Sequence, residues 1–281
     1  MAEENVRFEA DGQPFSMEWV RRTEPYSMGT DHYHGYYELY YLLAGERHYF
    51  IRDRSYRIRA GDLVFIDKRE LHKTAPAGGE AAHERLVVYF FDALLRPAYE
   101  RHAGLLLGAF RHPNPVCRLP LQEQARARRI VETLLAEMRN REPGCEIALK
   151  HGLIELLLLA ARNERHRDAA IEPPTAPLHR KMSEVAGWLN AHYAEPVSLA
   201  ELAARFHLSP AYLSRSFPRA VGLTVTAYVN LVRIRAAERL LKETDMSVTG
   251  VAHAVGYDNF SHFGKMFKKI TRMPPRAYRK S

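Results

Sequence analysis

The sequence has only two cysteines among its 281 residues, Cys117 and Cys145. Two thiols cannot form the set of disulfides that holds small secreted domains together, so a reducing compartment is expected. No apolar run approaches the roughly 20 residues that cross a bilayer. The densest one, Leu153 to Ala161, is short and contains Glu155. The first residues, MAEENVRFEADG, are acidic and lack the apolar segment of a secretory signal. These absences predict a cytoplasmic protein with no membrane partner.

The chain does have enough apolar residues to fold, and its charge is unevenly distributed. It is 46% hydrophobic and 26% charged, which suits about two domains with real cores. Residues 179–281 hold 16 basic and 7 acidic residues, whereas the rest of the chain holds 25 and 26. The whole net charge of +8 therefore comes from the C-terminal third. Such asymmetry indicates a neutral module joined to one that binds a polyanion, or else a basic domain that is merely soluble.

The first half of the chain reads as short strands. Between about residues 15 and 92, segments rich in Tyr, Phe, Val and Ile are separated by turn residues. They are Glu38 to Gly45, His48 to Ile51, Ser55 to Ile58, Leu63 to Ile66 and Leu86 to Phe91. Many short strands at close spacing predict a sandwich or small barrel. We assign this domain to residues 1–120.

A helical hairpin is predicted next, over residues 121–162. Gln122 to Arg141 and Glu146 to Arg162 have apolar residues at helical spacing, and Pro143-Gly144 separates them. The leucine run 156–159 is expected to expose more apolar surface than one partner helix covers. We therefore expect a homodimer, in which Ile130, Leu134, Met138, Leu153 and Leu157 pair across a two-fold axis. Residues 163–178 are polar and proline-rich, which is typical of a linker.

From His179 to the end the chain reads as helices and contains an internal repeat. Ser198 to Phe206 matches Ser247 to Val255, and each segment has an N-cap serine and apolar residues at i, i+3, i+4 and i+7. In each copy a tight turn and a capped second helix follow. This is the pattern of a helix-turn-helix, and two copies about 50 residues apart in the only basic region favour DNA binding.

Several segments of the C-terminal third resemble a known family. The segments LAARFHLSPAYLSRSF and VAHAVGYDNFSHFGKMFKK, the joining pattern Arg233-x-x-x-Ala237-x-x-Leu240-Leu241 and the final PPRAYR resemble the DNA-binding domain of AraC/XylS-type transcriptional regulators. The resemblance covers about 100 residues and implies two helix-turn-helix units joined by one long helix, with double-stranded DNA and RNA polymerase as partners. One departure is Arg272, where the family usually has glycine. If that position is left-handed, arginine costs about 1 kcal/mol or more there.

The second helix of each unit would enter the major groove. The residues that face outward and are expected to contact DNA are Ala211, Ser214 and Arg215 in the first unit, and Phe260, Ser261, His262 and Lys265 in the second. Arg215 is the best candidate for specificity, because a guanidinium matches guanine O6 and N7. Lys268, Lys269 and Arg276 are expected to contact phosphates. The alternatives are a solvated face for Arg215 and a core-capping role for Phe260.

The strand region contains His32-Tyr-His34-Gly-Tyr-Tyr-Glu38 and a later His72. This pattern resembles the metal motif of cupin jelly rolls. Alternation along a strand puts His32 and His34 on one face, and Glu38 and His72 would complete a set suited to Zn²⁺, Ni²⁺, Mn²⁺ or Fe²⁺. Ile66-Asp67-Lys68 departs from the usual Pro-x-Gly. Structural histidines or a polar ligand pocket therefore remain open, and no cofactor is required.

The same region is dense in tyrosine. Inward-pointing rings would give an aromatic cavity with polar handles, suited to a sugar or another small polar effector. We expect Tyr36, Tyr40, His34 and His72 to line it, although most of the tyrosines would simply fill the barrel core.

Taken together, these features predict an α+β protein that is not an enzyme. It would have an N-terminal cupin-like β jelly roll, a helical hairpin and a C-terminal all-α domain with two helix-turn-helix units at residues 179–281. Its predicted function is transcription regulation in response to a small-molecule effector. The alternative is a cupin metalloenzyme, a dioxygenase or an isomerase, with an accessory helical domain.

Overall fold

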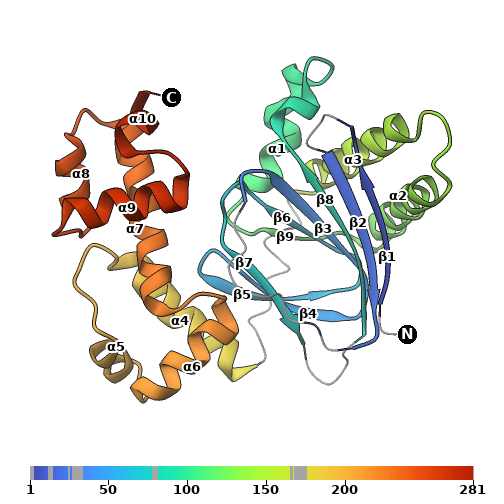
Figure 1. Ribbon diagram of the computed structural model, residues 1–281. Coiled ribbons are helices and arrows are strands. Elements are labelled where there is room, and N and C mark those ends of the chain that lie inside the picture. Colours follow the sequence, from blue (N-terminus) through green and yellow to red (C-terminus); the bar gives the residue numbers. More distant parts are fainter. Residues whose placement is uncertain are drawn as a thin grey trace. The chain divides into compact units, whose positions relative to one another are not determined.

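The computed structural model describes residues 3–11, 15–24, 26, 34–77, 82–164, 167 and 176–280. The chain divides into two compact units, Met1–His179 and Arg180–Ser281. Strands and three longer helices make up the first unit, and the second contains helices only (Figure 1). The protein is therefore of the mixed α+β class. No helix in the described part of the chain is both long and apolar enough to cross a membrane.

Two antiparallel sheets form the β-domain. The strands are β1 (Glu3–Glu9), β2 (Phe15–Arg22), β3 (Tyr37–Ala44), β4 (Glu46–Ile51), β5 (Arg54–Arg59), β6 (Asp62–Ile66), β7 (His72–Pro76), β8 (His83–Phe90) and β9 (Val116–Arg118). The larger sheet has the order β1-β2-β8-β3-β6-β9, and the smaller has the order β5-β4-β7. β1 is absent from the sequence-based prediction. It is an edge strand whose charged residues are exposed, so only Val6 and Phe8 carry the alternating apolar signal.

The larger sheet has a buried core on each face. On the outer face, Trp19, Leu39 and Phe65 pack with the helices. On the inner face, Tyr40, Val64 and Val87 pack with residues of the smaller sheet. Figure 1 shows the helices on one side of the large sheet and strands β4, β5 and β7 on the other. Because side chains alternate along a strand, neighbours such as Tyr40 and Tyr41 belong to different cores.

Helices cover the outer face. They are α1 (Ala103–Arg111), α2 (Leu121–Asn140) and α3 (Cys145–Arg162), and two short 3-10 turns, Asp92–Leu95 and Glu100–His102, precede α1. The turn between α2 and α3 has Arg141 and Gly144 in left-handed conformation, which reverses the chain at the predicted Pro-Gly break. Cys117 and Cys145 are both buried, unpaired thiols.

The leucine run of α3 is covered within the protomer. Leu156 and Leu157 are fully buried, and Leu159 is 3% exposed. The run has more apolar surface than α2 alone covers, as expected, but α1 and the outer-face core cover the rest within the protomer, so the run gives no support for a homodimer.

The predicted dimer face is wrong in its residues for the same reason. Ile130, Leu134, Met138, Leu153 and Leu157 all belong to the outer-face core, and none is more than 8% exposed. Side chains that fill a protomer's own core are not available to pair with a second copy.

One residue of the predicted linker is held against the first unit. Arg167 is buried and donates to the carbonyl of Ala109 at 3.1 Å, while its own carbonyl accepts from Asn114 at 2.7 Å. Its guanidinium also lies 4.8 Å from the centre of the Phe65 ring. The polar segment is thus anchored at this residue.

The second unit contains the predicted repeat. Its helices are α4 (Pro177–Ala191, which begins at the end of the first unit), α5 (Leu199–Arg205), α6 (Pro210–Val221), α7 (Val225–Glu243), α8 (Val248–Ala254), α9 (Phe260–Thr271) and α10 (Pro275–Lys280). Helices α5–α6 and α8–α9 are the two helix-turn-helix units, and α7 joins them. Side-chain caps begin all four repeat helices, from Ser198, Ser209, Ser247 and Asn259.

Candidate effector and DNA-binding sites

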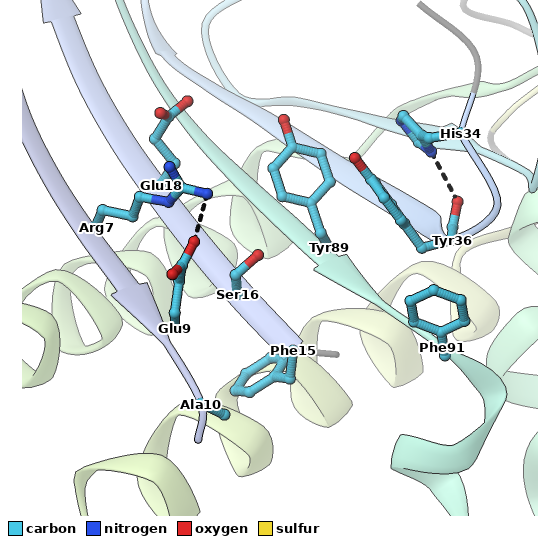
Figure 2. A pocket seen from close by; sticks show the side chains of 10 residues that line it. All are labelled: Arg7, Glu9, Ala10, Phe15, Ser16, Glu18, His34, Tyr36, Tyr89 and Phe91. Carbon is cyan, nitrogen blue, oxygen red and sulfur yellow. Dashed lines mark hydrogen bonds and ion pairs between the residues drawn. The ribbon is translucent and has the colours of Figure 1, made fainter. Parts of the chain in front are cut away.

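A cavity of about 500 Å³ opens on the inner side of the large sheet. It is lined by Arg7, Glu9, Ala10, Phe15, Ser16, Glu18, His34, Tyr36, Tyr89 and Phe91. Figure 2 shows the carboxylate of Glu18 and the hydroxyls of Tyr36 and Tyr89 toward one side, and the Phe15 and Phe91 rings toward the other. Polar groups and aromatic faces in one cavity of this size suit a small polar molecule.

Two of the four predicted effector residues line this cavity and two do not. His34 and Tyr36 are in its wall, with their rings stacked at 3.9 Å between centroids. Tyr40 and His72 are fully buried behind it. The sequence-based prediction missed Arg7, Glu18 and Tyr89, because they come from β1, β2 and β8. Only the strand order brings these three strands beside the start of β3.

A buried cluster of His34, Glu38 and His72 lies next to the cavity. Oε2 of Glu38 is 2.9 Å from Nε2 of His34 and 3.2 Å from Nε2 of His72. Oε1 of the same carboxylate accepts a hydrogen bond of 2.8 Å from the hydroxyl of Tyr49. The three ligand-type atoms lie within 4.8 Å of one another. The structure thus brings together three of the four residues predicted from the cupin-like motif. The fourth, His32, lies outside the described residues.

Backbone contacts determine how the two imidazoles are protonated. Nδ1 of His34 is 3.0 Å from the carbonyl of Tyr36, and Nδ1 of His72 is 2.9 Å from the carbonyl of Glu70. A carbonyl only accepts, so each Nδ1 carries the hydrogen. In a neutral ring, Nε2 then presents its lone pair to the Glu38 carboxylate. This arrangement is stable if the rings are protonated or if a cation lies among the three atoms, and Nδ1–H donation to a carbonyl is typical of metal-binding histidines.

The electrostatics of the cluster favour a negatively charged Glu38 and a positively charged His72. Burial, the largest influence, raises the pKa of Glu38, but His72 and His34 outweigh it and leave that pKa well below its usual range. Burial likewise lowers the pKa of His72, and the nearby Glu38 charge reverses this, so the net pKa is raised. Glu38 is therefore a carboxylate in the barrel interior.

The predicted DNA-contacting residues of the first helix-turn-helix unit lie on the exposed side of α6. Ala211, Ser214 and Arg215 are exposed, while Leu213 and Phe217 are fully buried. The Nε of Arg215 donates to the carbonyl of Ala211 at 3.3 Å, which holds the side chain along its own helix.

In the second helix-turn-helix unit, α9 has an equivalent exposed face. Phe260, Ser261, His262 and Lys265 are exposed, as are Lys268, Lys269 and Arg276. Phe263 and Phe267 are buried. The ring of Phe260 is 43% exposed and 6.2 Å from that of Phe263, so it lies at the edge of this core and not within it.

One exposed aromatic residue was missed. Tyr212 is 42% exposed and is the third residue of α6, the position that His262 has in α9. The repeat itself could have pointed to it, since the two helices align residue by residue. Ser214 and His262 also line one cavity of about 510 Å³, whose walls come from both helix-turn-helix units within residues 180–281.

Comparison with known proteins identifies the domains in which these two candidate sites lie. Residues 14–157 match the AraC-like ligand binding domain, and residues 202–281 match the helix-turn-helix domain. The chain belongs to the AraC family. It is a DNA-binding transcriptional regulator with a ligand-binding domain.

Among AraC-family relatives, the transcriptional activator RhaS of Pectobacterium carotovorum is 25% identical over 263 residues, covering 92% of this chain and 91% of its own. The transcriptional activator RhaR of Klebsiella pneumoniae is 25% identical over 258 residues, covering 91% and 89%. The solved structure of ToxT from Vibrio cholerae matches 95% of this chain and 98% of its own, at 14% identity and a TM-score of 0.37.

Proposed function

We propose that this AraC-family regulator responds to a polyhydroxylated small molecule, such as a sugar, bound in the cavity beside His34 and Tyr36. The observation that supports this is the lining of the cavity, which combines aromatic faces with the Glu18 carboxylate and the Arg7 guanidinium. Aromatic rings pack on the C–H faces of a sugar, and charged side chains bind its hydroxyls through charge-assisted hydrogen bonds.

Binding of a set of monosaccharides and sugar derivatives to the full chain tests this proposal. An effector should raise the unfolding temperature of the wild-type protein, because it binds only the folded state. The shift should be lost in Tyr36→Ala and kept in Tyr212→Ala, which removes an exposed tyrosine from the other unit. Equal shifts in the two variants would place binding outside the cavity.

We propose that each protomer recognises two different short DNA sequences about one helical turn apart. The support is the difference between the exposed residues of the two units, with Arg215 in α6 where α9 has Lys265. Sequencing the DNA fragments that the purified protein retains tests it. A two-part motif is expected, and random fragments would contradict sequence-specific binding.

The assembly is also a proposal. We infer a homodimer, with the two-part sites present as repeats, and contact with RNA polymerase at the promoter. Because the predicted interface residues of α2 and α3 are buried, any pairing of these helices uses their exposed faces, which carry Leu121 and Ile147 beside polar side chains. Sedimentation at micromolar concentration should give twice the monomer mass, and a monomeric mass would contradict the proposal.

A divalent cation at His34, Glu38 and His72 is a second proposal, with His32 as a further ligand and Zn²⁺, Ni²⁺, Mn²⁺ or Fe²⁺ as the ion. The donor set fits, because two Nε2 lone pairs and a carboxylate oxygen converge. Such an ion would supply a Lewis acid for the oxygen atoms of a ligand. Protein purified without a nickel column should contain near-stoichiometric metal. Unchanged metal in His32→Ala/His34→Ala would refute this ligand set.

We further propose that the chain has no catalytic role, in agreement with its relatives, which are transcriptional activators. The competing function is that of a cupin dioxygenase or isomerase, and it is favoured only by the same histidine–glutamate cluster. Product formation with added Fe²⁺ or Mn²⁺ that is lost in His34→Ala would support the enzyme instead.

A further inference from the structure

Three arginines point to the interior of the β-domain from its strands. Arg85 of β8 lies two residues before Val87, and Arg47 of β4 lies two residues before Tyr49, so both share the inner face with those core residues. Arg22, at the end of β2, pairs in register with His83 of β8. Arg47 and Arg85 are 1% and 8% exposed. Two buried guanidinium groups in one barrel are expensive unless anions compensate them.

The carboxylates of this region leave one arginine uncompensated. Arg85 is paired with Glu18 at 3.2 Å, and Arg22 with Glu3 at 2.9 Å. Arg47 instead donates to two neutral oxygens, Oγ1 of Thr74 at 2.6 and 3.0 Å and a backbone carbonyl, that of Tyr26, at 2.6 Å. Among the described residues, Arg47 forms no ion pair.

Several donors of this cluster have no acceptor among the residues that the structure describes. In the described part of the chain, Nη1 of Arg47, Nε of Arg85 and the hydroxyl of Tyr40 are buried without a hydrogen-bond partner. Tyr40 is 0% exposed, and its ring centre is 5.9 Å from the guanidinium carbon of Arg85. Unmatched buried donors are rare in folded proteins, and each one calls for an explanation.

The two buried arginines differ in their pKa values. Burial lowers the pKa of Arg85, but Tyr40, Tyr89 and Glu18 outweigh it, so that pKa is raised. The pKa of Arg47 falls to about 10, first because of burial and then because Arg85 and Arg22 are close and of like charge. Burial raises the pKa of the Tyr40 hydroxyl, the charges of Arg85, Arg47 and Arg22 lower it, and that of Glu38 raises it.

The cluster adjoins the cavity of Figure 2. Glu18 lines the cavity and also accepts from Arg85, so this carboxylate separates the two. In the sheet register, Glu18 of β2 lies opposite Val87 of β8, and Val87 lies opposite Tyr40 of β3. Tyr40 is therefore in the same row as Glu18, two strands away. A ligand in the cavity would thus have the cluster at its inner end.

We propose that the effector is an organic anion, whose carboxylate or phosphate is bound by Arg47, Arg85 and the hydroxyl of Tyr40. This inference rests on the proposed function, because it assigns a chemical class to the ligand of the same cavity. The anion supplies the acceptors that these three donors lack, and its charge balances Arg47. The uncharged part of the molecule occupies the aromatic cavity.

Thermal unfolding of the full chain tests the inference with inorganic phosphate and with acetate as probes. Each anion at 20 mM is compared with sodium chloride at the same ionic strength. The wild-type protein is expected to gain about 2–4 °C with at least one of the anions beyond the gain in chloride. A gain with phosphate alone indicates a phosphate ester, and a gain with acetate alone indicates a carboxylate.

Tyr40→Phe is the decisive variant, because it removes a hydroxyl that makes no hydrogen bond with any described residue. Its stability in chloride should equal that of the wild type, and its gain with the anion should be lost or at least halved. Arg47→Met should lose the gain completely. Tyr56→Phe is the matched control, since Tyr56 belongs to the same inner core. It should keep the full gain.

Two results would overturn the inference. One is a wild-type protein that gains no more with either anion than with chloride. The other is a gain that persists in both Tyr40→Phe and Arg47→Met, which would place the anion elsewhere, for example on the basic second unit. Retention of operator DNA by the same samples separates this inference from the proposed regulation. If a neutral sugar stabilises the wild type while neither anion does, the anion assignment fails and the proposed function stands.

Discussion

The two helix-turn-helix units have left-handed backbone at the same two positions, but different residues occupy these positions. Between the helices of each unit, one residue has positive φ, and it is His207 (φ 56°) in the first unit and Gly256 (φ 87°) in the second. At the end of the second helix the choice is reversed, with Gly222 (φ 101°) in the first and Arg272 (φ 65°) in the second. Each copy thus has one glycine and one ordinary residue at equivalent places.

The packing around each left-handed position explains which of them have glycine. A Cβ on Gly256 would lie 2.4 Å from the carbonyl oxygen of Ala194, and Gly222 is buried. His207 and Arg272 are both exposed, so their side chains have room even though their backbone is strained. The comparison teaches that a left-handed turn demands glycine mainly where another segment packs against it.

The units also differ at the start of their first helices. Ser198 and Glu201 form a reciprocal capping box at α5, with Ser198 Oγ accepting from the backbone N–H of Glu201. Ser247 caps α8 in the same way, but the third helical residue there is Gly250, which has no side chain to return the hydrogen bond. The second unit therefore begins with a weaker cap.

The largest effect is expected from Gly256→Ala. The new methyl group meets the backbone at Ala194 and also forces alanine into a left-handed conformation, so unfolding should become easier by about 2–4 kcal/mol. Urea denaturation of the full chain measures this. His207→Ala at the equivalent position is the control and should cost under about 1 kcal/mol, because histidine already has a Cβ there and alanine adds only little strain. A similar cost for both substitutions would break the proposed distinction.

The next effect concerns DNA. Arg215→Ala should weaken operator binding by about 1–3 kcal/mol and relax the preference at one guanine, because a bidentate contact to O6 and N7 is lost. Lys265→Ala, at the same helical position of the second unit, should cost less and change preference elsewhere in the site. Competition binding with single-base operator variants measures both.

Lys269→Ala provides the contrast to these two substitutions. An exposed lysine that contacts only phosphate should weaken all sequences similarly and reduce the salt slope by about one ion. If Arg215→Ala behaved in this way, with equal losses on operator and scrambled DNA, Arg215 would be a phosphate contact as well.

A smaller effect is expected from Arg272→Gly. Relief of the left-handed strain is partly offset by the greater freedom of glycine in the unfolded chain, so the net gain should be about 0.5–1 kcal/mol. Thermal or urea unfolding detects this. A loss of stability would mean that the arginine side chain contributes more than its backbone costs.

The smallest change is expected from His207→Gly. Histidine tolerates the left-handed region better than most residues, so strain relief and unfolded-state entropy should nearly cancel, within about 0.5 kcal/mol. A clear gain in urea unfolding would show that the two turns are more alike than their residues suggest.

The DNA-binding part of the chain, residues 180–281, was largely predictable because its signals are local. The N-cap serines, the apolar spacing of Leu213 with Phe217 and the repeat itself all lie within a few residues of the structure they specify. The exposed faces of α6 and α9 followed from that spacing. Tyr212 was not among the predicted contacts, although the repeat places it at the position of His262.

In the first part of the chain, residues 1–179, the fold class was predictable but the ligand-binding cavity was not. The strands and the hairpin helices have clear periodicity, and the cluster of His34, Glu38 and His72 follows a short motif. The leucine run of α3 was misjudged because it packs against α1 as well as α2, and α1 lies more than 30 residues before it in the sequence. The cavity could not be predicted either, since its walls come from β1, β2 and β8, and pairing of distant strands is not encoded in any one segment.

The sequence by itself determined the family, the duplicated DNA-binding unit and the local geometry of its caps and turns, because helix formation depends on neighbouring residues. Only the tertiary structure decided which side chains face the barrel interior together. Arg47 and Arg85 are ordinary charged residues in their own strands, and they became a shared cluster through the packing of two sheets face to face. Burial then determines their chemistry, because a charge removed from water must find a partner.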